Sequence, residues 1–152
     1  MKQKKKFKMG TQQNLLLIIV VFTVGLAVFV GLIAFNQRVV KSNRNACIED
    51  MNKFATIALA WWRTPVSQGG GDKVQNLDES HIDKVGIYIG FNHNSATNKI
   101  QTGNGTYELS NGGEFSLKFN GLGTEKFDGS FIEVDLIVNT ATGSINIEII
   151  NL

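Results

Sequence analysis

The side chains that could do chemistry in this chain are few and scattered. The histidines His81 and His93 are each isolated in a polar segment, which predicts solvated surface side chains. Zinc-site, EF-hand and HExxH spacings are absent from the sequence. Ser110, Ser116 and Ser130 have no histidine nearby in the sequence, and no nucleophile motif surrounds them. We therefore expect no catalytic residue, no cofactor-binding residue and no cofactor.

Two further segments carry residue types that bind ions or phosphates. Glu125, Asp128 and Asp135 are close in sequence and could hold calcium near a loop, so metal binding in residues 121–135 stays open although we expect no metal. The three glycines of residues 66–73 could suggest a phosphate loop. No Gly-Lys-Ser/Thr ending follows them and no strand precedes them, so we expect a flexible connection instead.

A long apolar run, LLLIIVVFTVGLAVFVGLIAF, occupies residues 15–35. Its 21 residues carry no charge, and at a helical rise of about 1.5 Å per residue they span about 30 Å, the thickness of a bilayer's hydrocarbon core. Five lysines precede it: Lys2, Lys4, Lys5, Lys6 and Lys8. By the positive-inside rule, they place the N-terminus in the cytoplasm and the rest of the chain outside it. The run is longer than a signal peptide's apolar region, and a poor cleavage site follows it.

The remaining residues suffice for one soluble domain of ordinary size, about 115 of the 152 residues. Five of the 15 basic residues lie in the first ten positions, which leaves 10 basic against 13 acidic residues from Thr11 onward. This acidic excess argues against a nucleic-acid-binding body, although a role in DNA uptake stays open. Cys47 is the single cysteine, so no intrachain disulfide is possible, and we expect it to be a small buried residue.

A helix is expected to continue beyond the apolar run, because residues 36–63 contain neither proline nor glycine. Pro65 disfavours helix at the residue before it, so one helix from about Asn14 to Arg63 is predicted. Apolar residues at helical spacing form a stripe along its second half, at Val40, Cys47, Met51, Phe54, Ala58 and Trp61. Of these, Met51, Phe54, Ala58 and Trp61 are predicted to pack against a sheet. For Trp62, subunit contact and packing beneath the glycine loop are equally open.

The C-terminal part changes to a period of two, which predicts strands. Residues 77–84 could form a short helix or turn, and residues 93–105 read as a surface loop. Strands are expected at 86–91, around 107–109, 115–119, 131–138 and 145–149. Turns are expected at 110–113, 121–130 and 139–143. The fold class is therefore α+β, with the long helix covering one face of a sheet of four or five antiparallel strands.

These features together resemble type IV pilins and type II secretion pseudopilins. The motif residues are Lys8, Met9, Gly10 and Thr11, followed by QQNLLLIIVVF. The resemblance implies a lollipop-shaped subunit, a prepilin peptidase that cuts after Gly10, and a mature chain whose often methylated N-terminal residue is Thr11. It divides the chain as leader 1–10, membrane half of the helix 11–35, amphipathic half 36–64, glycine-rich linker with short helix or turn 65–85, and β-sheet head 86–152.

The sequence departs from the family at Leu15, where most bacterial members carry a glutamate that neutralises a neighbouring subunit's N-terminus. Some minor pilins and tip pseudopilins also lack that acid, so the departure bears on recruitment and on major-subunit status. Leu15, Gly25, Ala27 and Gly31 are the expected assembly residues, the last two being a small-xxx-small pair. Ordinary membrane-helix composition also explains this pair.

The resemblance predicts a structural function: a subunit, minor pilin or pseudopilin, of a type IV pilus-like filament or secretion pseudopilus. The implied partners are a prepilin peptidase, other pilin-like subunits, an inner-membrane assembly platform and membrane lipid. The implied location is the bacterial inner membrane, with the N-terminus cytoplasmic, and then a periplasmic or cell-surface filament. The alternative is an uncleaved, membrane-anchored binding module. An anchored enzyme is a third class for which the sequence offers no site.

Overall fold

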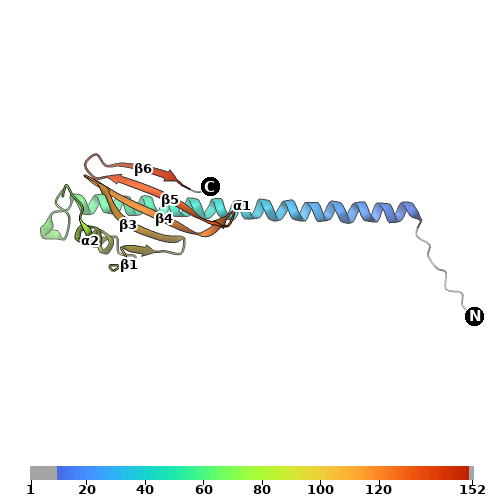
Figure 1. Cartoon of the computed structure of the whole chain (residues 1–152), viewed down its shortest axis with the longest axis horizontal. Coiled ribbons are helices and arrows are strands. Elements are labelled where there is room, and N and C mark those ends of the chain that lie inside the picture. Colours follow the sequence, from blue (N-terminus) through green and yellow to red (C-terminus); the bar gives the residue numbers. More distant parts are fainter. Residues whose placement is uncertain (1–9, 151–152) are drawn as a thin grey trace, which may run out of the picture. The chain divides into compact units, whose positions relative to one another are not determined.

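The computed structural model describes residues 10–150, and Figure 1 shows their helices and strands. The chain divides into two compact units, one up to Arg38 and one from Val39 onward. The first unit is helical wherever it is described beyond Gly10. The second unit holds the sheet, the short helices and the hydrophobic core.

Helix α1 runs from Thr11 to Arg63 without interruption. It begins three residues before the predicted start and ends at the predicted residue. The end follows from Pro65, which adopts an extended conformation with φ −60° and ψ 150°. The backbone N–H of Thr64 closes the last turn by donating to the carbonyls of Ala60 and Trp61, at 3.1 Å each.

The sheet of the second unit has six strands rather than the predicted four or five. Its strands are β1 (Asn92–Asn94), β2 (Lys99–Gln101), β3 (Gly105–Gly113), β4 (Ser116–Phe127), β5 (Ser130–Asn139) and β6 (Ser144–Ile149). Each strand pairs antiparallel with the next along the chain, so the spatial order is the sequence order. The α+β class is confirmed. The two extra strands, β1 and β2, lie within residues 92–101, most of which were wrongly predicted to be a loop.

The predicted strand at residues 86–91 is also wrong, because most of it belongs to helix α2 (Glu79–Ile89). Ile82, Val85 and Ile89 are its buried apolar residues, at helical spacing. The Asp78 side chain caps the helix by accepting from the backbone N–H of His81, and Gly90 ends it in the left-handed conformation. A short apolar run alone does not distinguish a strand from a buried helix. Here the N-cap at Asp78 indicates that the run belongs to a helix.

The hairpin turns are only partly as predicted. The turn between β5 and β6 lies where it was expected, after Asn139. Between β3 and β4 the hairpin exists, but β3 continues to Gly113 and the turn follows it. The turn predicted over 121–130 is wrong, because β4 runs to Phe127 and only Asp128 and Gly129, both with positive φ, form the reversal. Asp-Gly is a preferred pair for such a tight hairpin turn.

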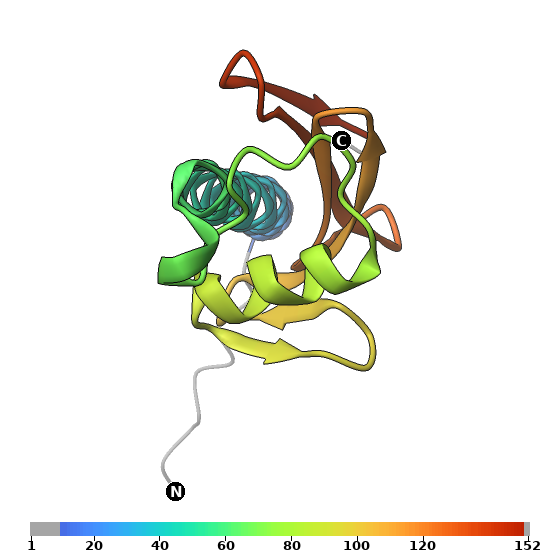
Figure 2. The same ribbon diagram turned by 90° about the vertical axis from the view of Figure 1, so that its left-hand side faces the viewer.

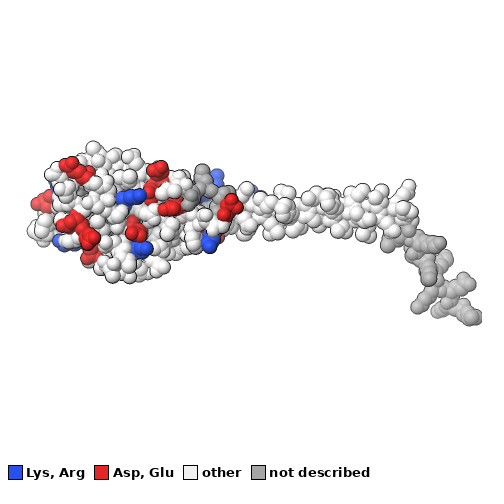
Figure 3. Space-filling view, in the orientation of Figure 1, with Lys and Arg blue, Asp and Glu red and all other residues white. Residues whose placement is uncertain are grey.

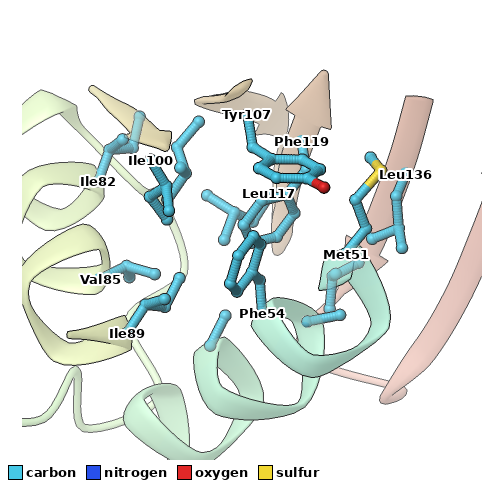
Figure 4. Close-up of a cluster of buried hydrophobic side chains, with 14 of the residues drawn as sticks. Met51, Phe54, Ile82, Val85, Ile89, Ile100, Tyr107, Leu117, Phe119 and Leu136 are labelled. Atoms are coloured by element: carbon cyan, nitrogen blue, oxygen red, sulfur yellow. The ribbon is translucent and has the colours of Figure 1, made fainter. Parts of the chain in front are cut away.

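The core of the second unit lies between α1 and the concave face of the sheet. Figure 2 shows the sheet curving around the helix, with α2 closing the side near β1 and β3. The largest fully buried side chains come from both the helix and the sheet and include Trp61, Tyr107, Phe54, Phe119 and Met51. Phe54 is the centre of an aromatic group, with its ring centroid 5.1 Å from that of Tyr107 in an edge-to-face arrangement (Figure 4).

Candidate functional site

No part of the chain within residues 10–150 covers the position that a side chain on Gly10 would take, next to the bond to Thr11. Gly10 is the first described residue and stands outside the helix, whereas Thr11 is its first residue. The Gly10 carbonyl accepts from the backbone N–H groups of Gln13 at 2.9 Å and Asn14 at 3.3 Å. No described atom lies within 4 Å of the position that a side chain on Gly10 would take. Breaking the bond between residues 10 and 11 would thus leave every helical residue of α1 in the product. The five lysines between positions 2 and 8 lie outside the described residues.

The apolar segment, residues 15–35, makes no buried contact in the single chain. Its large side chains are all at least 43% exposed, and that of Leu15 is 60% exposed. A side chain added at Gly25 or Gly31 would have no described neighbour within 4 Å, and Ala27 is exposed as well. Figure 3 shows no charged side chain on the visible face of this segment. An exposed apolar surface of this size is stable only when it contacts lipid or other apolar helices.

The polar groups of this segment are satisfied within the helix. Thr23 is the one polar residue of the run, and its hydroxyl donates to the carbonyl of Ile19 at 2.8 Å. Such internal pairing is what a hydrocarbon environment requires. Within residues 10–150, α1 is long and apolar enough to cross a membrane, with a mean hydropathy of 3.1 over its most apolar window. This end of the chain is therefore a candidate membrane anchor.

Along the second half of α1, the stripe residues Met51, Phe54, Ala58 and Trp61 are all buried. The helix approaches β4 closely because that strand carries glycines where it faces α1. A side chain on Gly121 would lie 2.9 Å from Met51 Sδ, and one on Gly123 would lie 2.4 Å from the Asn43 side-chain oxygen. These glycines, which suggested a turn in the sequence, instead make room for the helix.

Asp50 is a polar anchor between α1 and the sheet that was not predicted from the sequence. Its Oδ2 atom accepts three hydrogen bonds from one side of the sheet: from the Thr102 hydroxyl at 2.9 Å, Asn104 Nδ2 at 2.9 Å and the Tyr107 hydroxyl at 3.1 Å. Burial, as the main cause, raises the pKa of the Tyr107 phenol above its ordinary value. One indication of this role was present in the sequence: Asp50 directly precedes Met51, so it lies at the side of the buried stripe of α1.

Asn43 forms a second anchor about two turns earlier in α1, and it was also missed. Its Oδ1 accepts from the backbone N–H groups of Thr124 at 3.1 Å and Glu125 at 3.2 Å, and its Nδ2 donates to the Asn104 carbonyl at 2.9 Å. The register of β4 and β5 shifts between Leu122 and Lys126. Asn43 therefore pairs backbone groups in the stretch where the strand ladder is irregular.

The glycine-rich loop caps the end of α1 through several hydrogen bonds. Trp61 Nε1 donates to the Gly69 carbonyl at 3.0 Å, and Trp62 Nε1 donates to the Val74 carbonyl at 2.8 Å. The backbone N–H of Gly71 in turn donates to the Trp61 carbonyl at 2.9 Å. The backbone N–H of Lys73 also donates to the Trp62 carbonyl at 2.8 Å, so the loop is tied to the end of α1 by contacts that the expectation of a flexible connection at residues 66–73 did not include. Trp62 is buried beneath it.

The prediction for His93 was wrong, because its side chain is only 4% exposed. It packs against α2, where a side chain on Gly86 would meet the imidazole ring. Its Nδ1 atom lies 3.8 Å from Asp83 Oδ1. The His81 side chain is half-buried beside Asp78. No cluster of three ligating residues that could hold a metal occurs within residues 10–150, around either histidine or elsewhere.

The three acids considered for calcium do not converge. Asp135 lies in the middle of β5, where its Oδ2 contacts Lys118 Nζ at 2.6 Å and its Oδ1 accepts from Asn120 at 2.8 Å. Asp128 lies in the turn seven residues earlier, and Glu125 precedes it in β4. Of these three acids, Asp135 is the buried one, and its carboxylate is already paired with Lys118. The arrangement therefore offers no cation site.

Comparisons with known proteins give no relative for this chain. No protein family matches it, no curated protein matches it, and no solved structure matches it.

Proposed function

We propose that this chain is a structural subunit, and not an enzyme, of an extracytoplasmic filament of the type IV pilin or pseudopilin kind. The observation that carries the proposal is the position of the helix start: α1 begins at Thr11, immediately after an open Gly10. A cut between them removes residues 1–10 with all five leader lysines and leaves an uninterrupted helix. A prepilin peptidase at the cytoplasmic membrane face is the partner that this cut requires.

The exposed apolar segment gives the processed chain two environments. In the inner membrane, residues 15–35 contact lipid, with the head outside the cytoplasm. In a filament, the same side chains contact the helices of other subunits, and the small residues Gly25, Ala27 and Gly31 permit close approach. An inner-membrane assembly platform moves the subunit from the first environment to the second.

Leu15 favours a minor pilin or pseudopilin over a major subunit. No acid occurs before Glu49 in the sequence, so the first turn of α1 has no carboxylate to neutralise the N-terminus of a neighbour. Gln12, Gln13 and Asn14 offer neutral hydrogen bonds instead. A subunit present in few copies, whose neighbours carry the acid, does not need one itself.

The test is assembly in the native cell, measured by electron microscopy and immunoblotting of sheared surface fractions. Gly10→Val blocks close approach to the scissile bond and should leave the chain as an unassembled precursor. Gly103→Val is the matched control, because Gly103 also has open space around it but lies in the head. If Gly10→Val behaves like wild type in both processing and localisation, the chain is instead an uncleaved anchored binding module.

A further inference from the structure

The two edges of the sheet differ in how open they are to another strand. The β1 edge has three residues, and its Asn92 and Asn94 are polar. The β6 edge has six residues, contains neither proline nor lysine, and pairs with β5 in an uninterrupted register. Proline, charged side chains, bulges and shortness are the devices that block edge pairing. Strand β1 is protected by its shortness, whereas β6 carries one such device, the charge of Glu148.

The hydrogen bonding of β6 shows which of its backbone groups are free. The backbone N–H of Ile150 donates to the Glu133 carbonyl at 3.0 Å, so residue 150 points its backbone groups at β5. In an antiparallel ladder this orientation alternates along the strand. The N–H and C=O groups of Ile145, Ile147 and Ile149 therefore point away from β5, as three donors and three acceptors at the open edge.

The side chains of these isoleucines are on the core face but extend beyond the cover of α1. Ile145, Ile147 and Ile149 are opposite Val138, Leu136 and Val134 of β5, all three of which are fully buried. Ile147 and Ile149 are nevertheless 40% and 39% exposed. The open edge thus combines free backbone groups with a row of exposed apolar side chains.

We propose that β6 pairs antiparallel with β6 of a second copy of this chain, about a twofold axis at Ile147. In this register Ile147 is opposite the partner's Ile147, and Ile145 is opposite the partner's Ile149. The three outward-facing residues of each strand then exchange backbone hydrogen bonds directly. Asn146 is opposite the partner's Glu148, which places an amide beside a carboxylate and opposes no like charges.

Neighbouring twofold registers are worse. An axis at Glu148 puts the two Glu148 carboxylates directly opposite each other, which is destabilising. An axis at Asn146 leaves Ile149 opposite residue 143, beyond the start of β6, so one outward residue of each strand loses its partner. The charge pattern and the strand length therefore select the register at Ile147.

This contact is separate from the one that would build a filament. A twofold contact uses the same surface on both copies and closes on itself, whereas a filament needs a head-to-tail contact between different surfaces. An antiparallel pair about a twofold axis reverses one head relative to the other. The β6 pairing therefore joins subunits of two different filaments, or chains released into detergent, and not two chains anchored side by side in one membrane. It requires no cleavage at Gly10, so its failure would leave the proposed function untouched, and failure of the filament proposal would leave the pairing intact.

Cysteine cross-linking of the full chain in detergent tests the pairing and its register. Directly opposed residues in such a pair have Cα atoms about 5.5 Å apart, within the range of a disulfide. Ile147→Cys should form a cross-linked dimer under mild oxidation. An equal mixture of Ile145→Cys and Ile149→Cys should form the mixed dimer, while each variant alone stays at the wild-type background. Native Cys47 is buried and present in every sample.

Two variants separate this contact from association through the apolar segment. Ile137→Cys, 39% exposed but on the outer face of β5, should give no dimer. Ile147→Pro, added to the 145 and 149 mixture, should abolish the mixed dimer without breaking the β5–β6 ladder, because the N–H that it removes points outward. Cross-linking of Ile145→Cys alone, equal cross-linking of Ile137→Cys, or no cross-linking at 147 would overturn the proposal.

Discussion

Tyr107 of β3 donates its hydroxyl hydrogen to Asp50 of α1, with the two oxygens 3.1 Å apart and the residues 57 positions apart in the chain. The same carboxylate oxygen accepts from Thr102 and Asn104. One side chain thus fixes the rotation and height of α1 against β3 and the turn between β2 and β3. The apolar stripe of the helix chooses which face is buried, and this polar contact sets where along the sheet it lies.

Replacing Asp50 with alanine is therefore expected to destabilise the head. Three donors, including the hydroxyl of the fully buried Tyr107, lose their acceptor at once. A buried donor left unsatisfied costs about 1–3 kcal/mol, so a loss of about 2–4 kcal/mol in unfolding free energy is expected. Urea unfolding of the full chain in detergent, followed by tryptophan fluorescence, measures it. Glu49→Gln is the control, because its ion pair with Lys53 is exposed and should contribute almost nothing.

Gly123→Ala should disturb the contact between α1 and the β4 bulge. The added methyl group would lie 2.4 Å from Asn43 Oδ1, which must move away from the N–H groups of Thr124 and Glu125. We expect a cost of about 1–3 kcal/mol, the usual range for overpacking. Gly103→Ala, which meets open space, should leave stability unchanged. Equal unfolding midpoints for the two variants would show that α1 does not approach β4 this closely.

The buried phenol of Tyr107 should make the stability of the folded chain depend on pH in alkali. Tyr88 is 44% exposed, whereas burial, aided by the nearby Cys47 thiol, raises the pKa of Tyr107. Because the folded pKa lies above the unfolded value of about 10, folding opposes loss of the Tyr107 proton, and stability falls as the pH rises above about 10. Urea unfolding of the full chain at a series of pH values on either side of about 10 should show this loss of stability.

The Tyr88→Phe variant isolates the buried group. Tyr107 is the one tyrosine left in this variant, so phenolate absorbance should not appear until the chain unfolds in alkali. Phenolate that forms at about pH 10 while the chain is still folded would contradict the burial of Tyr107.

The elements that could be predicted from the sequence are those whose signals are local. The end of α1 follows from Pro65, the hairpin after Asn139 from its turn residues, and the buried stripe from its spacing. The errors arose where a residue's role depends on distant partners. Gly121 and Gly123 were predicted to be turn residues, because the residues next to them in the sequence give no sign that α1 packs against them. His93 was predicted to be exposed because the last turn of α2, whose Gly86 faces it, was predicted to be a strand.

The residues of the candidate site also fall into those that the sequence alone could reveal and those that it could not. Gly10 and residues 15–35 stand out by composition and position alone, without any knowledge of the fold. Asp50 and Asn43 do not, because both polar side chains act on backbone or side-chain groups more than 50 positions away. The hydrogen bonds of the glycine loop were missed for the same reason, since they depend on the indole N–H groups of Trp61 and Trp62 reaching its carbonyls.

The most direct test of the proposed function is the N-terminus of the mature chain. Intact-mass analysis and N-terminal peptide mapping of the protein from its native cells should show a chain that begins at Thr11, with or without an added methyl group, and lacks all five leader lysines. A chain that retains Met1 through Gly10 in cells with an active prepilin peptidase would contradict the proposal and leave a permanently anchored protein in its place.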